Sequence, residues 1–157
     1  MPHRAWSKLS SQQAGRYAEY FVQMTFTAYR YSVYRTEVDD RGIDCVVRLD
    51  NGPYYEIQVK SLRKPGYVFT PKSKTPLAPD RLIVFAYMLD GEEPALYLIP
   101  SLAWRQPNAL LKDRDYGPGK KSEPEWGLNV SSKTMPALEE YNFDRVIHSL
   151  GEFVGDS

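Results

Sequence analysis

Apolar and polar residues alternate with a period of two between positions 43 and 61, which predicts a β-hairpin. β-branched and aromatic residues dominate from Ile43 to Leu49 and from Tyr54 to Ser61. The sequence Asp50-Asn51-Gly52-Pro53 between them has the chemistry of a turn. Because successive side chains on a strand point to opposite faces, the second strand has a polar face, which consists of Glu56, Gln58 and Lys60.

The turn sets which residues of the two predicted strands lie opposite each other. A three-residue loop of Asp50-Asn51-Gly52, with Gly52 in the left-handed conformation, places Asp44 opposite Gln58. A two-residue Asn51-Gly52 turn instead places Asp44 opposite Val59, on the apolar face, where an unpaired carboxylate is costly. The three-residue loop is therefore the preferred interpretation.

The remaining periodicity predicts helices at both ends of the chain and strands between them. Ser10 or Ser11 can cap a first helix that runs to about Ala28. Prolines make a long helix improbable from Leu62 to Asp80, where a turn or a short extended piece at 67–69 is expected. The other expected elements are strands at 29–38, 81–89 and 95–99, a short helix after Ser101, a loop-rich stretch at 107–126, an edge strand at 127–131, and a closing helix to about Leu150.

Composition narrows the class of protein without naming a function. The 157 residues suit one domain, 1–157, of α/β type with a mixed sheet of about five strands. No apolar run is long enough to span a membrane, and the N-terminus lacks the apolar stretch of a secretory signal. Cys45 is the single cysteine, so no internal disulfide can form. These features predict a cytoplasmic protein.

Charge is balanced overall but unevenly distributed along the chain. Lys+Arg and Asp+Glu both number 20, which does not by itself favour a nucleic-acid partner. The segment from Lys60 to Arg81 is nevertheless basic, and it follows the polar strand directly. A phosphate backbone could run along this segment, or the segment could be an ordinary solvated loop, and both interpretations stay open. The candidate contacts for nucleic acid are Arg63, Lys64, Lys72 and Lys74.

Side chains that could bind a metal or take part in catalysis converge on the polar face of the hairpin. Asp44 and Gln58 offer the hard oxygen ligands that Mg²⁺ accepts, and Lys60 could orient or deprotonate an attacking water. The alternative is a solvated strand face without function. On the first helix, Glu19 lies at the border of the apolar stripe, where it must reach solvent or meet a metal, Lys60 or another polar group.

This arrangement resembles the PD-(D/E)XK nuclease superfamily. Asp44 matches the Asp of the motif, Lys60 matches its Lys, and Glu19 occupies the place of the upstream helical Glu. The sequence departs from the pattern at Ile43, where the motif has Pro, and at Gln58, where it has a second carboxylate. Gln-x-Lys variants occur among homing and bacterial nucleases, and the resemblance covers residues 10–62.

The resemblance implies a restriction-endonuclease-like fold and hydrolysis of DNA phosphodiesters with Mg²⁺ or Mn²⁺. It implies metal ligands at Asp44, Gln58, Glu19 and the backbone carbonyl of Val59, and a water-positioning role for Lys60. Cutting both strands of a duplex in this superfamily usually calls for a symmetric dimer, so a homo-oligomer is a further expectation. Two alternatives stay open: a degenerate nuclease fold that binds nucleic acid or protein without cleavage, and an interaction protein that uses its acidic C-terminal helix.

Overall fold

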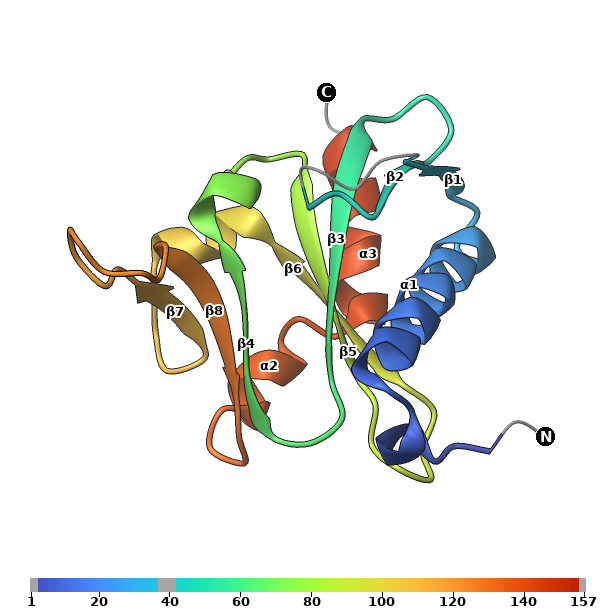
Figure 1. The fold of residues 1–157 in the computed structure, drawn as a ribbon. Coiled ribbons are helices and arrows are strands. Elements are labelled where there is room, and N and C mark those ends of the chain that lie inside the picture. Colours follow the sequence, from blue (N-terminus) through green and yellow to red (C-terminus); the bar gives the residue numbers. More distant parts are fainter. Residues whose placement is uncertain (1–2, 37–41, 156–157) are drawn as a thin grey trace.

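A computed structural model describes residues 3–36 and 42–155 of the chain (Figure 1). A five-stranded mixed sheet in the order β1-β2-β3-β5-β6 forms its centre. Strand β3 runs parallel to β5, and all other neighbours in this sheet are antiparallel. The strands are β1 (Ser32–Arg35), β2 (Cys45–Arg48), β3 (Tyr54–Leu62), β5 (Arg81–Tyr87) and β6 (Ala95–Pro100). The predicted α/β class and five-stranded mixed sheet are confirmed.

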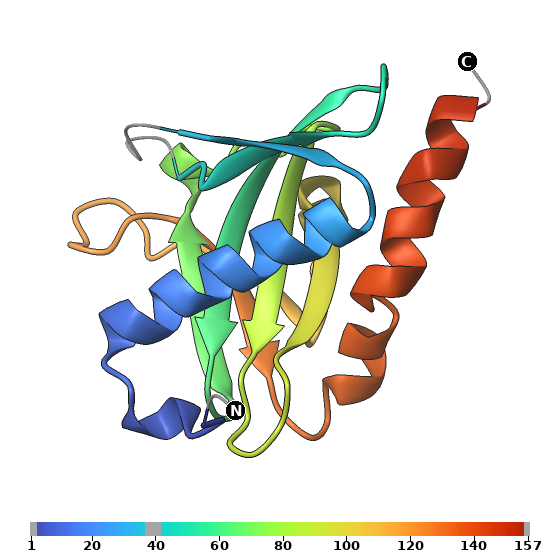
Figure 2. The same ribbon diagram turned by 90° about the vertical axis from the view of Figure 1, so that its right-hand side faces the viewer.

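A second, three-stranded sheet in the order β4-β8-β7 packs on one face of the central sheet. Its strands are β4 (Gly66–Pro71), β7 (Leu111–Arg114) and β8 (Glu125–Val130). Helices α1 (Ser11–Ala28) and α3 (Phe143–Gly155) cover the opposite face, as Figure 2 shows. The short elements are η1 (Trp6–Lys8), η2 (Lys72–Lys74), η3 (Ser101–Arg105) and α2 (Met135–Glu139). Within the described residues, no helix is long and apolar enough to cross a membrane.

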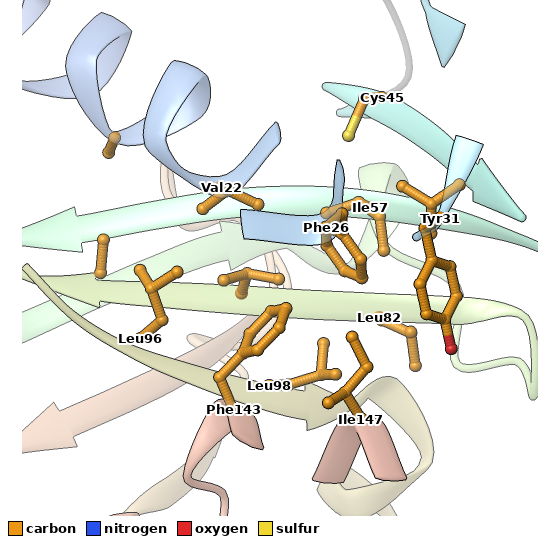
Figure 3. Close-up of a cluster of buried hydrophobic side chains, with 14 of the residues drawn as sticks. Val22, Phe26, Tyr31, Cys45, Ile57, Leu82, Leu96, Leu98, Phe143 and Ile147 are labelled. Atoms are coloured by element: carbon orange, nitrogen blue, oxygen red, sulfur yellow. The ribbon is translucent and has the colours of Figure 1, made fainter. Parts of the chain in front are cut away.

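Local sequence explains the position of α1. The Ser10 hydroxyl accepts a hydrogen bond from the Gln13 backbone N–H at 3.1 Å, and the Gln13 side chain accepts from the Ser10 N–H at 2.9 Å, which is a capping box. Four residues spaced four apart then form a buried stripe: Ala14, Ala18, Val22 and Phe26. Figure 3 shows Val22 and Phe26 of this stripe packed on the central sheet. The predicted end of the helix near Ala28 is confirmed.

The hairpin has the predicted register, but a different residue is left-handed. Cys45 pairs with Ile57 and Arg48 with Tyr54, which is the register of the three-residue loop. The expectation that Gly52 is left-handed is wrong, because Asp50 has a φ of 49° instead. Aspartate tolerates this region through local hydrogen bonding of its short side chain. The Gly52 N–H donates to the Leu49 carbonyl at 2.8 Å and closes the turn.

Three sequence expectations need correction beyond the hairpin. The first strand is shorter than 29–38, because the chain leaves α1 through a left-handed Arg30 before β1 begins. The expected edge strand, β8, lies at the centre of the second sheet, between β4 and a β7 that the sequence did not reveal. The closing helix is divided into α2 and α3, because Asn142 forms a bridge with Tyr97 between them.

Arg81 also differs from its expected role in a basic surface. It opens the central strand β5, and the residue is only 2% exposed. Its guanidinium donates to the Glu56 carboxylate at 2.7 Å and to the Lys74 backbone carbonyl. Arg81 therefore joins β3 to the η2 segment, and it is not available to a phosphate backbone.

Candidate active site

Two hydrogen bonds fix Asp44 beside β3. Its backbone N–H donates to the Ile57 carbonyl at 2.8 Å, and its Oδ2 accepts from the Val59 N–H at 2.6 Å. The two bonds lie on either side of Gln58, so the carboxylate is next to Gln58 as the register predicted. Because a backbone N–H holds one carboxylate oxygen, the direction of this side chain is set by β3 itself.

Lys60 lies on β3, two residues after Gln58, and its side chain shares the face of Gln58 because of strand alternation. The residue is half-buried and pairs with Phe85 of β5 in the parallel ladder. The central position of β3, between β2 and β5, gives Lys60 a rigid backbone. Asp40, which the sequence suggested as an acidic neighbour, lies outside the described residues.

The charges of Glu19 and Asp44 both influence the pKa of one buried thiol, that of Cys45. Cys45 is fully buried between α1 and the hairpin (Figure 3). Burial raises the pKa of this thiol to about 12, and the negative charges of Asp44 and Glu19 contribute to the increase. The half-buried Glu19 is thus close enough to the start of β2 for its charge to reach Cys45. Helix α1 and the hairpin bring the two predicted carboxylates to one region.

The Cys45 thiol is expected to resist alkylation in the folded protein. A pKa of about 12 keeps the thiolate scarce at pH 8, whereas an unfolded cysteine with an ordinary pKa of about 8.5 is partly ionised there. Labelling with iodoacetamide, followed by mass spectrometry, should give almost no product for the native chain at pH 8 and complete labelling in denaturant. Rapid labelling of the native chain at this pH would contradict the buried placement.

Gln58 belongs to a closed ring of three side chains. It is 3% exposed, and its Nε2 donates to the Thr70 hydroxyl at 2.8 Å. The Thr75 hydroxyl donates to Gln58 Oε1 at 2.6 Å, and the two threonine oxygens are 2.8 Å apart. The ring connects β3 to β4 and to the residue that follows η2. A sequence prediction could not find Thr70 and Thr75, because no local pattern distinguishes them from ordinary strand and loop threonines.

Counting protons shows why position 58 carries an amide. A hydroxyl has one proton, and Thr75 uses it on Gln58 Oε1, so Thr70 must donate to Thr75. Thr70 then needs a donor of its own, which the Gln58 amide supplies. An ionised glutamate at position 58 has no proton to donate, and it would require both hydroxyls for itself. The two threonine oxygens would then face each other without a proton between them.

Gly42 closes the space beside this ring. Its φ is 71°, and a Cβ there would lie 3.2 Å from Gln58 Nε2 and 3.3 Å from the Lys74 carbonyl oxygen. Both the conformation and the close approach favour glycine. The segment before Asp44 is therefore held against Gln58 without a side chain between them.

The predicted nucleic-acid contacts divide into engaged and exposed side chains. The Arg63 guanidinium donates to the Leu9 carbonyl at 2.6 Å and to the Trp6 carbonyl at 3.2 Å, which ties the segment before α1 to the residue after β3. Lys72 forms an ion pair with Asp113 and lies 4.1 Å from the centre of the Trp126 ring. Lys64 and Lys74 are exposed.

The donor set fits a hard divalent cation held by few protein ligands. Mg²⁺ in such sites keeps several waters and binds through one or two carboxylates. Asp44 supplies a fixed carboxylate, Glu19 lies in the same region, and Gln58 Oε1 uses one lone pair on Thr75 and has a second. Among the described residues, no three His, Cys, Asp or Glu side chains gather closely enough to form a metal cage.

Comparisons with known proteins give matches in structure alone. No protein-family model matches the chain, and no curated protein matches its sequence. The Holliday junction resolvase Hjc of Archaeoglobus fulgidus is similar, with a TM-score of 0.49 and 14% identity, over 78% of this chain and 88% of that one. A bacterial homing endonuclease, I-Ssp6803I, has a TM-score of 0.56 and 17% identity, over 94% of this chain and 99% of that one.

The match across nearly the whole length of both chains defines the fold class. The chain has a restriction-endonuclease-like fold, as the sequence motif predicted. The assignment of this fold rests on the similarity to the homing endonuclease I-Ssp6803I.

Proposed function

We propose that the chain is a metal-dependent DNA endonuclease that hydrolyses phosphodiester bonds. The observation that supports this most is the placement of Asp44 beside Gln58, with Lys60 two residues further along the same face of β3, in a fold shared with a homing endonuclease. The sequence motif predicts metal binding by Asp44 and Gln58 and the positioning of water by Lys60, and it adds Glu19 as a further ligand.

Each side chain has a proposed role that follows from its position. Asp44 would hold a divalent cation with Gln58 Oε1 and the Val59 carbonyl, and Glu19 would hold an associated water or a second ion. A bound Mg²⁺ or Mn²⁺ supplies Lewis-acid stabilisation of the charge that grows on the phosphate. Lys60 positions the attacking water and places its positive charge beside the scissile phosphate.

One observation favours a second candidate function. Gln58 uses its amide in a buried ring, so the site has one carboxylate fewer than the motif and a weaker field for Mg²⁺. A nuclease fold that binds nucleic acid without cutting it is compatible with this arrangement. Such a module would bind DNA in the presence of chelator and leave it intact.

The test is cleavage of a panel of plasmid, branched and single-stranded DNA with Mg²⁺ or Mn²⁺ and with chelator. The native chain is expected to cut at least one substrate only when metal is present. Lys60→Ala should reduce the cleavage rate by roughly 100-fold or more, because it removes the group that positions water and stabilises charge. A failure of the native chain to cut any substrate would favour the binding module.

A further inference from the structure

The three-stranded sheet lies to one side of the central sheet (Figure 1), and its outer face points away from it. This outer face carries aromatic and cationic side chains. Val68, Leu111 and Leu128 pack inward against the apolar cluster between the two sheets, so their strand neighbours point outward. We call this surface the β4-β8-β7 outer face, and it consists of Tyr67, Phe69, Lys112, Arg114, Glu125, Gly127 and Asn129.

Two aromatic rings form the flat part of this face. Tyr67 and Phe69 stack with centroids 6.0 Å apart and an angle of 19° between their planes. Tyr67 lies directly on Gly127, where any Cβ would overlap with its ring, and its hydroxyl donates to Glu125. Phe69 is 49% exposed, which is unusual for a phenylalanine on an ordered strand. Tyr67 is thus fixed from below, and the Phe69 ring is presented to solvent.

The charges that this face presents to solvent are positive. The Arg114 guanidinium lies 4.0 Å from the centre of the Tyr67 ring, and Arg114 is exposed. Lys112 lies in the same row of the sheet as Phe69, across Gly127. The carboxylate on this face, Glu125, is in a residue only 4% exposed, and it accepts the Tyr67 hydroxyl. Within these strand rows a partner therefore meets cations and an aromatic ring, because the carboxylate of Glu125 is covered.

We propose that the β4-β8-β7 outer face binds unpaired bases of single-stranded nucleic acid, with Phe69 stacking on a base and Arg114 and Lys112 contacting the adjacent phosphates. Base stacking on exposed aromatic side chains, combined with cations that follow the backbone, is the general mode of single-strand binding. Paired bases in a duplex cannot stack on a ring in this way, so the proposal selects single-stranded segments over duplex.

This inference rests on the proposed action on DNA and defines its substrate class further. Strand β4 connects the face to the candidate active site, because Thr70 bonds to Gln58 and its neighbour Phe69 points to the opposite side of the same strand. A substrate with an unpaired segment, such as a branched or flapped DNA, can engage both places. The outer face and the active site lie on different sides of β4, so they can be disabled separately.

The experiment measures binding of a fluorescently labelled oligothymidine and of a duplex of equal length by fluorescence anisotropy, with chelator present to prevent cleavage. Phe69→Ala is expected to weaken single-strand binding by about tenfold with little change for the duplex, because stacking on one base is lost. Tyr54→Ala is the matched control, since Tyr54 is also an exposed strand aromatic, at 50%, with Arg48 stacked on it at 4.4 Å. Equal binding by the Phe69 variant, the control and the native chain would overturn the proposal.

The dependence of binding affinity on salt concentration distinguishes the contribution of base stacking from that of phosphate contacts. Arg114→Ala should reduce the slope of log affinity against log salt by about 0.7, as expected for one phosphate contact on a single strand, whereas Phe69→Ala should leave the slope unchanged. Arg114→Lys should restore the slope because it keeps the charge. A slope that does not respond to Arg114→Ala would remove the phosphate contact from the proposal.

The outcomes distinguish this inference from the proposed nuclease function. Cleavage by the native chain together with unchanged single-strand binding by Phe69→Ala would contradict the inference and retain the nuclease. Single-strand binding that depends on Phe69, without cleavage of any substrate, would retain the binding face and contradict the nuclease. Equal melting temperatures of the variants and the native chain establish that lost binding is not lost folding.

Discussion

Gln58→Glu is expected to lower the melting temperature by roughly 6–12 °C at neutral pH, although it restores the usual motif. The ring of Gln58, Thr70 and Thr75 needs one donor from position 58, and an ionised glutamate supplies none. A charge in a residue that is 3% exposed, with two hydroxyl oxygens forced together, should destabilise by about 3 kcal/mol. For a chain of this length, each kcal/mol shifts the melting temperature by roughly 2–4 °C, and thermal unfolding followed by circular dichroism measures it.

A double-mutant cycle assigns this destabilisation to the ring. With Thr75→Ala in place, the Thr70 hydroxyl can donate to the carboxylate introduced at position 58 without facing a second oxygen. Gln58→Glu should therefore lower the melting temperature less in that background than in the native one. Additive effects of the two substitutions, or a Gln58→Glu variant as stable as the native chain, would show that the amide is not required at this position.

Asp44→Asn is expected to reduce DNA cleavage by roughly 1000-fold or more, the largest effect on activity. Asparagine keeps the shape of the side chain and an oxygen that can accept the Val59 N–H, which is now bonded to Asp44 at 2.6 Å. It removes the negative charge that would hold the cation, and a bound metal contributes several kcal/mol of transition-state stabilisation. Initial rates of DNA cleavage at saturating Mn²⁺ measure the loss.

Asp44→Ala is the matched control, because it removes the charge and the bond to Val59 together. We expect both variants to lose cleavage, and we expect the melting temperature to fall further in Asp44→Ala than in Asp44→Asn. If Asp44→Asn keeps the native rate, Asp44 does not bind the metal. If Asp44→Asn unfolds as readily as Asp44→Ala, the charge itself supports the fold.

The elements predicted correctly are those with local signals. The α1 helix follows from a capping box and a stripe spaced every four residues, and the hairpin register follows from alternation and loop length. The second sheet has no such signal, because β4 and β8 are separated by more than fifty residues and β7 is a short polar strand. Non-local pairing of this kind leaves little trace in a single sequence.

The candidate site also divides into features with a local sequence signal and features that depend on distant residues. Alternation along the hairpin placed Asp44, Gln58 and Lys60 together, because strand geometry is local. The sequence could not show which basic side chains are free to contact a phosphate backbone. Lys72 pairs with Asp113 of the distant strand β7, and Arg63 donates to backbone carbonyls. The ring around Gln58 also escaped prediction, because Thr75 approaches β3 only after the chain has passed through β4 and η2.

The most direct measurement is cleavage of the DNA panel by the native chain and by Asp44→Asn, at equal concentrations, with Mn²⁺ and with EDTA. The native chain is predicted to cut with metal and to lose all activity in EDTA, and Asp44→Asn is predicted to remain inactive in both conditions while retaining DNA binding. Cleavage that persists in EDTA, or that is equal in the two proteins, would contradict a metal-dependent nuclease site at Asp44.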